Sequence, residues 1–279
     1  MTHVQRATAK EFSPDGRTLD KYWFLGNPHK PPLLFIPGFT GTHSDLLEVA
    51  EFLEKDYYII IPEMPGWGES ERFSQKLTIH NYAKYLKKLI DATELKDITV
   101  VGHCMGATVA IELACLYPCI TKTVVLVSTP YRKGQLTQEL FIHLADLSVH
   151  LPEPFRPLFY FWRSRVLSIP VSLFTLKFRT LKQKVKSLHH LYKYQPTEPE
   201  ESVEECWTSL MHYNYNKIKK IKVPIHFIHG EKDMLVNQAH AVKLFSMVHG
   251  ATIDFIPDAG HIPPSETPHS LATLILKYK

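Results

Sequence analysis

The sequence predicts an α/β fold, in which a mostly parallel central sheet carries helices on both faces. Short apolar runs alternate with longer helix-forming segments along most of the chain, and this rhythm is typical of parallel strands joined by helical crossovers. The rhythm breaks once, between about residues 131 and 222. A chain of 279 residues is long enough for one large domain or for a core with an insertion.

Each expected element follows from local composition. Seven segments are short, apolar and rich in β-branched or aromatic residues, which is typical of buried strands. They are residues 22–25, 33–36, 57–61, 98–101, 124–128, 225–229 and 252–256. Five longer segments have the composition of helices. They are residues 44–54, 79–93, 105–117, 238–248 and about 268–279.

The most informative stretch follows the fourth expected strand, residues 98–101. It reads Gly102-His103-Cys104-Met105-Gly106 and leads directly into an expected helix. Glycines two positions before and after Cys104 leave room for a sharp turn between strand and helix. The central side chain of such a turn projects at a helix N-terminus, where negative charge is stabilised. This pattern indicates a nucleophile elbow with a cysteine as the nucleophile, although a small buried cysteine is the alternative.

A nucleophile needs a base, and the base needs a group that orients it. Asp233 and His261 each follow an expected strand, so the carboxyl ends of the strands should bring them to the same sheet edge as Cys104. The sequence thus predicts a Cys104–His261–Asp233 triad. Glu231 and Asp258 are alternative acids, and His261 could instead be a solvated loop residue.

Five motifs occur in an order that resembles the α/β-hydrolase superfamily. They are residues 33–41, the loop at 63–70, the elbow at 102–106, the segment 228–233 and the segment 258–261. The resemblance extends from about residue 21 to residue 279. It implies a core of residues 1–130 and 223–279 and a helical cap inserted at residues 131–222. It also implies an oxyanion hole formed by the backbone N–H groups of Phe39 and Met105.

Three positions depart from the usual pattern of that superfamily. Glu63 replaces the customary aspartate of the 63–70 loop, and Pro37 stands where many members have histidine. Cys104 stands where most members have serine, either as the natural residue or as a replacement of a serine nucleophile. We therefore expect a hydrolase that cleaves a carboxylic ester or thioester through a covalent acyl-enzyme.

Other functions remain open at this point. A cysteine acyl-enzyme is a thioester, so transfer of the acyl group to an amine or alcohol is one alternative. Hydrolysis of a carbon–carbon bond is a second, because such enzymes share the triad and cap. A non-catalytic protein that binds a small ligand with the same fold is the third.

The expected cap carries the main clue to the substrate. Between residues 154 and 197 there are nine Lys or Arg and no Asp or Glu, interleaved with many aromatic residues. Such a stretch can touch an anionic membrane surface or collect acyl substrates. Alternatively, the aromatic residues face the core and the basic ones are solvated. Candidate pocket residues are Trp67, His103, Phe161 and Trp162.

Composition narrows the remaining possibilities. The net charge of +4 is too small to indicate nucleic-acid binding, so the expected partner is a small acyl substrate. The triad carries the chemistry, so we expect no cofactor, and no metal-ligand spacing is found. The polar start of the chain and four cysteines that suggest no disulfide framework lead us to expect a cytoplasmic protein. The oligomeric state is left open.

Overall fold

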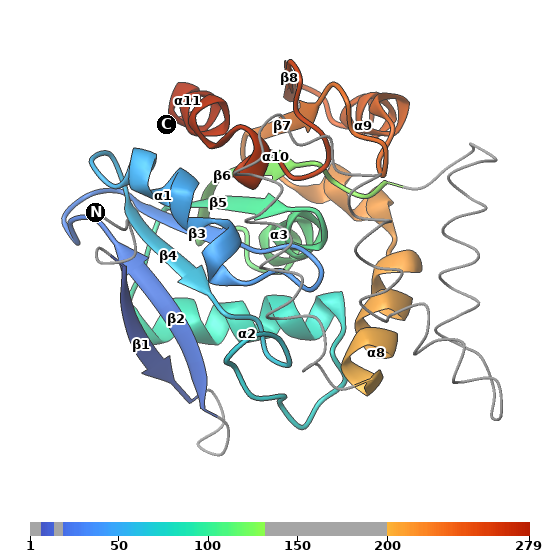
Figure 1. Ribbon diagram of the computed structural model, residues 1–279. Coiled ribbons are helices and arrows are strands. Elements are labelled where there is room, and N and C mark those ends of the chain that lie inside the picture. Colours follow the sequence, from blue (N-terminus) through green and yellow to red (C-terminus); the bar gives the residue numbers. More distant parts are fainter. Residues whose placement is uncertain (1–6, 14–18, 132–199) are drawn as a thin grey trace, which may run out of the picture.

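The computed structural model describes residues 7–13, 19–131 and 200–279. The described strands form one eight-stranded sheet in the order β1-β2-β4-β3-β5-β6-β7-β8 (Figure 1). β1 and β2 run antiparallel to their neighbours, and the other strands are parallel to one another. The bounds are β1 Thr8–Phe12, β2 Asp20–Leu25, β3 Pro32–Ile36, β4 Tyr58–Pro62, β5 Ile98–His103, β6 Thr121–Val127, β7 Ile225–Gly230 and β8 Thr252–Ile256.

The seven expected strands are all present, and β1 is the strand that sequence reasoning missed. Four of its five residues are exposed, because it forms the edge of the sheet beside β2 alone. A solvated edge strand tolerates charged side chains such as those of Lys10 and Glu11. It therefore lacks the apolar run that predicted the other strands.

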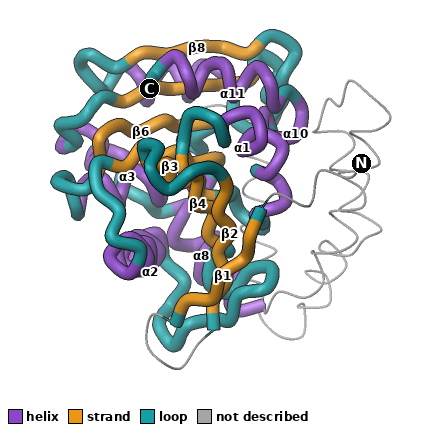
Figure 2. Tube along the Cα trace, turned by 90° about the vertical axis from the view of Figure 1, so that its left-hand side faces the viewer, coloured by secondary structure: helices purple, strands orange, loops and turns teal. Residues whose placement is uncertain are grey.

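Helices cover both faces of the sheet (Figures 1 and 2). α1 (Leu47–Leu53) and α11 (Pro268–Lys277) contact each other on one face, beside the one-turn α10 (Pro263–Glu266). On the other face α2 (Ile79–Ala92) packs against α3 (Met105–Leu116), and the core of that face also includes residues of α9 (Gln238–Phe245). Two 3-10 helices, η2 (His43–Asp45) and η3 (Tyr215–Lys220), and helix α8 (Glu200–Met211) complete the described elements.

The central strands are buried on both faces. Along β5, Val100 packs into the cluster under α2 and α3, whereas Val101 packs into the cluster under α1 and α11. The same alternation holds for Val124 and Val125 of β6. This is why these strands read as nearly continuous apolar runs. The α/β architecture predicted from the sequence is confirmed.

Helix α8 lies within the expected cap and is hydrogen-bonded to the core at the start of α2. Glu205 accepts hydrogen bonds from Arg72 and from the backbone N–H of Leu77, each at 2.8 Å. Ser209 accepts one from the backbone N–H of Ile79 at 2.9 Å. Residues 132–199 lie outside the described part of the chain, so the division at residues 131 and 222 stays a prediction. In the described ranges, no helix combines the length and apolarity that crossing a bilayer requires.

Glu112 of α3 joins three elements on the α2–α3 face. Its carboxylate is 1% exposed and accepts hydrogen bonds from Lys217 of η3, His80 of α2 and Tyr213. Burial raises the pKa of Glu112, but these three partners outweigh it and leave the pKa below its usual value. The carboxylate is therefore held in its charged form inside the fold.

We predict that Glu112→Ala lowers the free energy of unfolding by about 2 kcal/mol, because three donors lose a charged acceptor. Urea denaturation followed by circular dichroism measures this. Lys87→Ala is the control, because it breaks an exposed pair with Asp91 expected to contribute less than about 0.5 kcal/mol. Equal losses in the two variants would contradict the assignment of Glu112 as a link between elements.

Candidate active site

The turn between β5 and α3 places Cys104 in a conformation that few side chains adopt. Its φ is 50° and its ψ is −116°, and its backbone N–H is held by the carbonyl oxygen of Val127 at 2.9 Å. Cys104 directly precedes α3, so its side chain lies at the positive end of the helix dipole. Strain of this kind at a strand–helix turn is typical of a nucleophile elbow.

Both glycines of the elbow are required by close backbone contacts. A Cβ atom on Gly102 would lie 2.2 Å from the carbonyl oxygen of Gly106. A Cβ atom on Gly106 would lie 2.4 Å from the carbonyl oxygen of Ile36, at the end of β3. The helix start therefore packs directly onto two neighbouring strand ends, which fixes the position of Cys104.

The loops after β7 and β8 are pressed together in a similar way. A Cβ atom on Gly230 would lie 2.1 Å from the carbonyl oxygen of Gly260. The backbone N–H of Lys232 donates to the carbonyl oxygen of Ala259 at 2.8 Å. This contact brings Asp233 and His261 together, and Oδ2 of Asp233 lies 2.9 Å from Nδ1 of His261.

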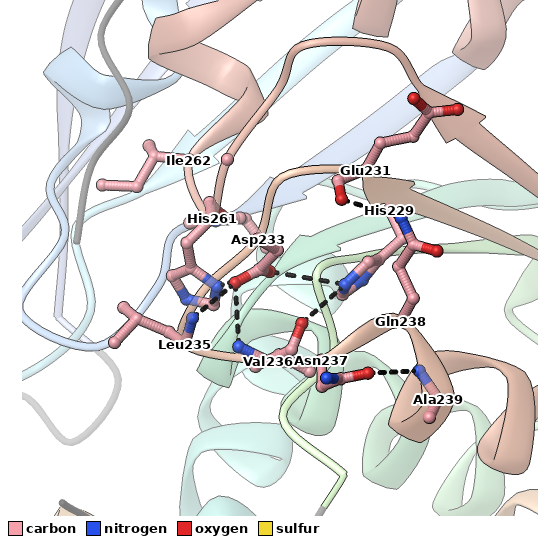
Figure 3. A network of polar contacts seen from close by, with 12 residues as sticks. His229, Glu231, Asp233, Leu235, Val236, Asn237, Gln238, Ala239, His261 and Ile262 are labelled. Carbon is pink, nitrogen blue, oxygen red and sulfur yellow. Dashed lines mark hydrogen bonds and ion pairs between the residues drawn. The ribbon is translucent and has the colours of Figure 1, made fainter. Parts of the chain in front are cut away.

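Asp233 is nearly buried, and both of its carboxylate oxygens have partners (Figure 3). Oδ1 accepts the backbone N–H groups of Leu235 and Val236 at 2.9 and 2.8 Å. Burial raises the pKa of Asp233, but the charge of His261 and these hydrogen bonds outweigh burial and hold the pKa below its usual value. The carboxylate is thus charged and oriented toward His261.

The other candidate acids lie elsewhere. The side chain of Glu231 points away from Asp233 (Figure 3), and Asp258 forms an exposed ion pair with Lys232. Of the three candidate acids, Asp233 is therefore the one that contacts His261.

His261 is 6% exposed and lies between Asp233 and Cys104. Burial lowers the pKa of His261. The charge of Asp233 and its hydrogen bond with His261, with a further contribution from the neighbouring Cys104, outweigh burial and raise the pKa well above 6.5. The three side chains that the sequence pointed to are therefore gathered at one edge of the sheet, with His261 in the middle.

Two further groups hold the backbone around His261. Glu266 of α10 accepts the N–H groups of Gly260 and Ile262, each at 2.8 Å. His103 donates its Nε2 proton to the carbonyl oxygen of His261 at 2.9 Å. Burial and the charge of His261 lower the pKa of His103 to about 4, so this imidazole is neutral near pH 7. Sequence reasoning missed Glu266, because a carboxylate five residues after a histidine has no distinctive spacing.

The expected oxyanion loop runs beside the elbow. A Cβ atom on Gly38 would lie 3.4 Å from Cβ of Cys104 and 3.0 Å from Nδ1 of His103. Phe39 follows in this loop, and Met105 is the first residue of α3, where backbone N–H groups lack partners within the helix. The loop that carries Phe39 and the helix start that carries Met105 thus both lie beside Cys104.

Two tryptophan side chains pack against Phe39 of this loop. The ring of Phe39 lies 5.4 Å from that of Trp67 and 5.8 Å from that of Trp207, both at steep angles. Trp67 is 1% exposed and donates its indole N–H to Tyr82 at 2.7 Å, so it supports Phe39 from within the core. Trp207 belongs to α8 and was missed, since α8 lies in the expected cap and carried no motif. Phe161 and Trp162 lie outside the described residues and stay predictions.

With the fold and the site described, comparisons with known proteins identify the family. Residues 33–274 match the profile of the Alpha/beta hydrolase family. The chain belongs to this family. Among its relatives, human monoacylglycerol lipase ABHD6 is 26% identical over 92% of this chain and 78% of that protein. Lipase 1 of Psychrobacter immobilis is 25% identical over 86% of this chain and 74% of that protein.

Solved structures agree with the fold. A putative lipase from Acinetobacter baumannii AYE superimposes with a TM-score of 0.77 at 21% identity, covering 98% of this chain and 90% of that one. A hydrolase from Pseudomonas aeruginosa PA01 gives a TM-score of 0.80 at 16% identity, covering 97% and 98%. The chain is therefore an α/β-fold hydrolase with relatives named as lipases.

We predict that Asp233→Asn destabilises the protein most between about pH 4 and the raised pKa of His261. Asp233 has a lowered pKa, so its contribution is complete above 3.8 and is lost as the pH falls through the folded value. His261 has a raised pKa, so its contribution is complete below 6.5 and is lost as the pH rises through the folded value. Near pH 6 the loss should be about 3 kcal/mol.

Urea denaturation of both proteins at several pH values checks this window. Asp258→Asn is the matched control, because it removes an exposed carboxylate from the neighbouring loop. A loss for Asp233→Asn that does not change with pH would contradict the charged pair.

Proposed function

We propose that this α/β-hydrolase cleaves carboxylic esters or thioesters through a covalent acyl-enzyme on Cys104. One observation carries the proposal. Cys104 projects at the start of α3 beside His261, and His261 is oriented and kept positively charged by the buried carboxylate of Asp233. A cysteine beside an imidazole that a carboxylate orients has the arrangement needed for nucleophilic attack by sulfur and for proton donation by the histidine.

Acylation begins with attack of the Cys104 thiolate on the carbonyl carbon of the substrate. The new carbon–sulfur bond pushes an electron pair onto the carbonyl oxygen, which faces the backbone N–H groups of Met105 and Phe39. When the carbonyl re-forms, the bond to the leaving alcohol or thiol breaks. His261 gives its proton to the departing oxygen or sulfur, and a thioester on Cys104 remains.

Deacylation runs through the same groups in reverse. His261 is now neutral and takes a proton from a water molecule, whose oxygen attacks the thioester carbon. The carbon–sulfur bond breaks, the carboxylic acid departs and the Cys104–His261 ion pair is restored. Asp233 keeps Nδ1 of His261 protonated throughout, so Nε2 is the nitrogen that exchanges protons with substrate.

Two observations support a substrate with an apolar acyl chain. Phe39 of the expected oxyanion loop packs against Trp207 of α8, and these two partly exposed rings, with the buried Trp67 behind Phe39, offer apolar surface to a chain. Relatives of this protein carry the names monoacylglycerol lipase and lipase. We therefore infer that the substrate is an ester of a medium or long acyl chain.

Acyl transfer is a second candidate, and the cysteine itself favours it. A thioester reacts more readily with amines and thiols than an oxygen ester does, so an acceptor other than water can compete for the acyl group. Hydrolysis and transfer share the acylation step and differ only in which nucleophile enters afterwards.

We predict that wild-type protein mixed with a p-nitrophenyl ester gains the mass of one acyl group, seen by intact-mass spectrometry, while p-nitrophenol is released. Cys104→Ala should show no adduct because the nucleophile is gone. Cys115→Ala is the matched control, since burial raises the pKa of Cys115 to about 11 and keeps it unreactive. An adduct of equal yield in Cys104→Ala would overturn the proposal.

The lifetime of the adduct separates the two candidates. A hydrolase should lose the acyl group in water within its turnover time, whereas a transferase should hold it until an amine or alcohol is added. Cys104→Ser provides the comparison. If the serine variant turns over in water at least tenfold faster than wild type, the cysteine favours acyl transfer over hydrolysis. Product analysis with and without acceptor checks the outcome.

A further inference from the structure

A second histidine lies against the carboxylate of Asp233. His229 of β7 is 1% exposed, and its Nε2 lies 3.5 Å from Oδ2 of Asp233 (Figure 3). The same nitrogen lies 2.8 Å from the carbonyl oxygen of Val236. A carbonyl oxygen only accepts hydrogen bonds, so Nε2 carries the proton and donates it. The hydrogen bond runs to Val236, and the carboxylate that orients His261 lies 3.5 Å from the same polarised N–H group.

The protonation state of His229 follows from its other nitrogen. Nδ1 is buried and has no hydrogen-bond partner among the described residues. A second proton there would be a buried, unpaired cationic N–H, which is costly. In agreement, burial lowers the pKa of His229 despite the neighbouring charge of Asp233. His229 is thus a neutral hydrogen-bond donor whose buried Nδ1 has no hydrogen-bond partner among the described residues.

The ring of His229 has little freedom to turn away. Phe255 of β8 packs edge-on against it, with ring centroids 6.3 Å apart and planes at 80°. The carbonyl oxygen of Val236 accepts the hydrogen bond from Nε2, and the N–H of Val236 donates to Oδ1 of Asp233 at 2.8 Å. Val236 thus binds one oxygen of the carboxylate, and His229, which is hydrogen-bonded to Val236, contacts the other.

We propose that His229 is a positioning residue that anchors the carboxylate of Asp233 and limits how strongly it holds the proton of His261. This inference rests on the proposed roles of Asp233 and His261. With the N–H of His229 in place, the negative charge of Asp233 is shared between His261, His229 and two backbone donors. Without it, more of that charge acts on His261, whose proton is then released less readily to the leaving group.

Four other titratable groups lie near His229 and His261, and all four are the same in wild type and in a variant of His229 alone. They are Cys104 next to His261, His103 at the end of β5, Glu266 of α10 and His240 of α9. A change in the titration of His261 after substitution of His229 alone is therefore assignable to the lost N–H.

His229→Phe removes the donor, and His229→Gln keeps an amide N–H close to the position of Nε2. In the NMR spectrum of histidine-labelled protein, His261 is assigned by its loss in His261→Gln. We expect the pKa of His261 to be higher in His229→Phe than in wild type, and unchanged in His229→Gln. The alkaline limb of the kcat/KM profile should move in the same direction, and kcat/KM near pH 7 should fall roughly tenfold in the Phe variant only.

If His229→Phe does not fold, His229→Met replaces it, since a flexible thioether fills irregular space. The proposal is wrong if the folded variant without the N–H donor, His229→Phe or His229→Met, leaves the titration of His261 unchanged. A loss of stability in that variant would then mean that His229 only anchors the loop. The NMR titration needs no substrate. Failure of the wild type to form an acyl adduct would therefore count against the proposed function and leave the test of His229 intact.

Discussion

The geometry of the candidate active site depends on how the carboxylate of Asp233 is held. A carboxylate buried this deeply is stable in its charged form only when donors surround it. Oδ1 takes the N–H groups of Leu235 and Val236, and Oδ2 faces the two imidazoles of His229 and His261. These contacts hold the carboxylate in one orientation, and the hydrogen bond to Oδ2 in turn orients the ring of His261.

That arrangement is possible because the strand ends pack at backbone distance. Gly230 touches the backbone of residues 259–260, and Gly106 touches the end of β3. Any side chain at these glycines would push apart loops that carry Cys104, Asp233 and His261. The close packing at these glycines thus brings the three candidate catalytic side chains together at the ends of their strands. This explains why residues separated by more than a hundred positions in the sequence meet at one edge.

The sequence predicted the parts of this site that are encoded locally. A glycine-flanked cysteine after a β-branched strand specifies an elbow by itself, and aspartate and histidine after later strands complete the set. His229, Glu266 and Trp207 were not predictable in this way. Their roles arise from contacts with groups distant in the chain, and their local spacing matches many unrelated segments. β1 was missed for a different reason, since an exposed edge strand lacks the apolar run on which strand prediction depends.

Glu63, which replaces the customary aspartate, shows how the fold accommodates a longer side chain near the expected oxyanion loop. The side chain is fully buried, and Oε2 lies 2.6 Å from Nδ1 of His43. His43 in turn stacks on Trp23 with ring centroids 3.4 Å apart.

Glutamate is longer than the usual aspartate, and the extra length is taken up where Gly68 leaves space. A Cβ atom on Gly68 would lie 2.4 Å from Oε1 of Glu63. Burial raises the pKa of Glu63, although His43 opposes this. The longer acid therefore reaches the 3-10 helix η2, which follows the expected oxyanion loop, and contacts both the backbone N–H and the ring of His43 there.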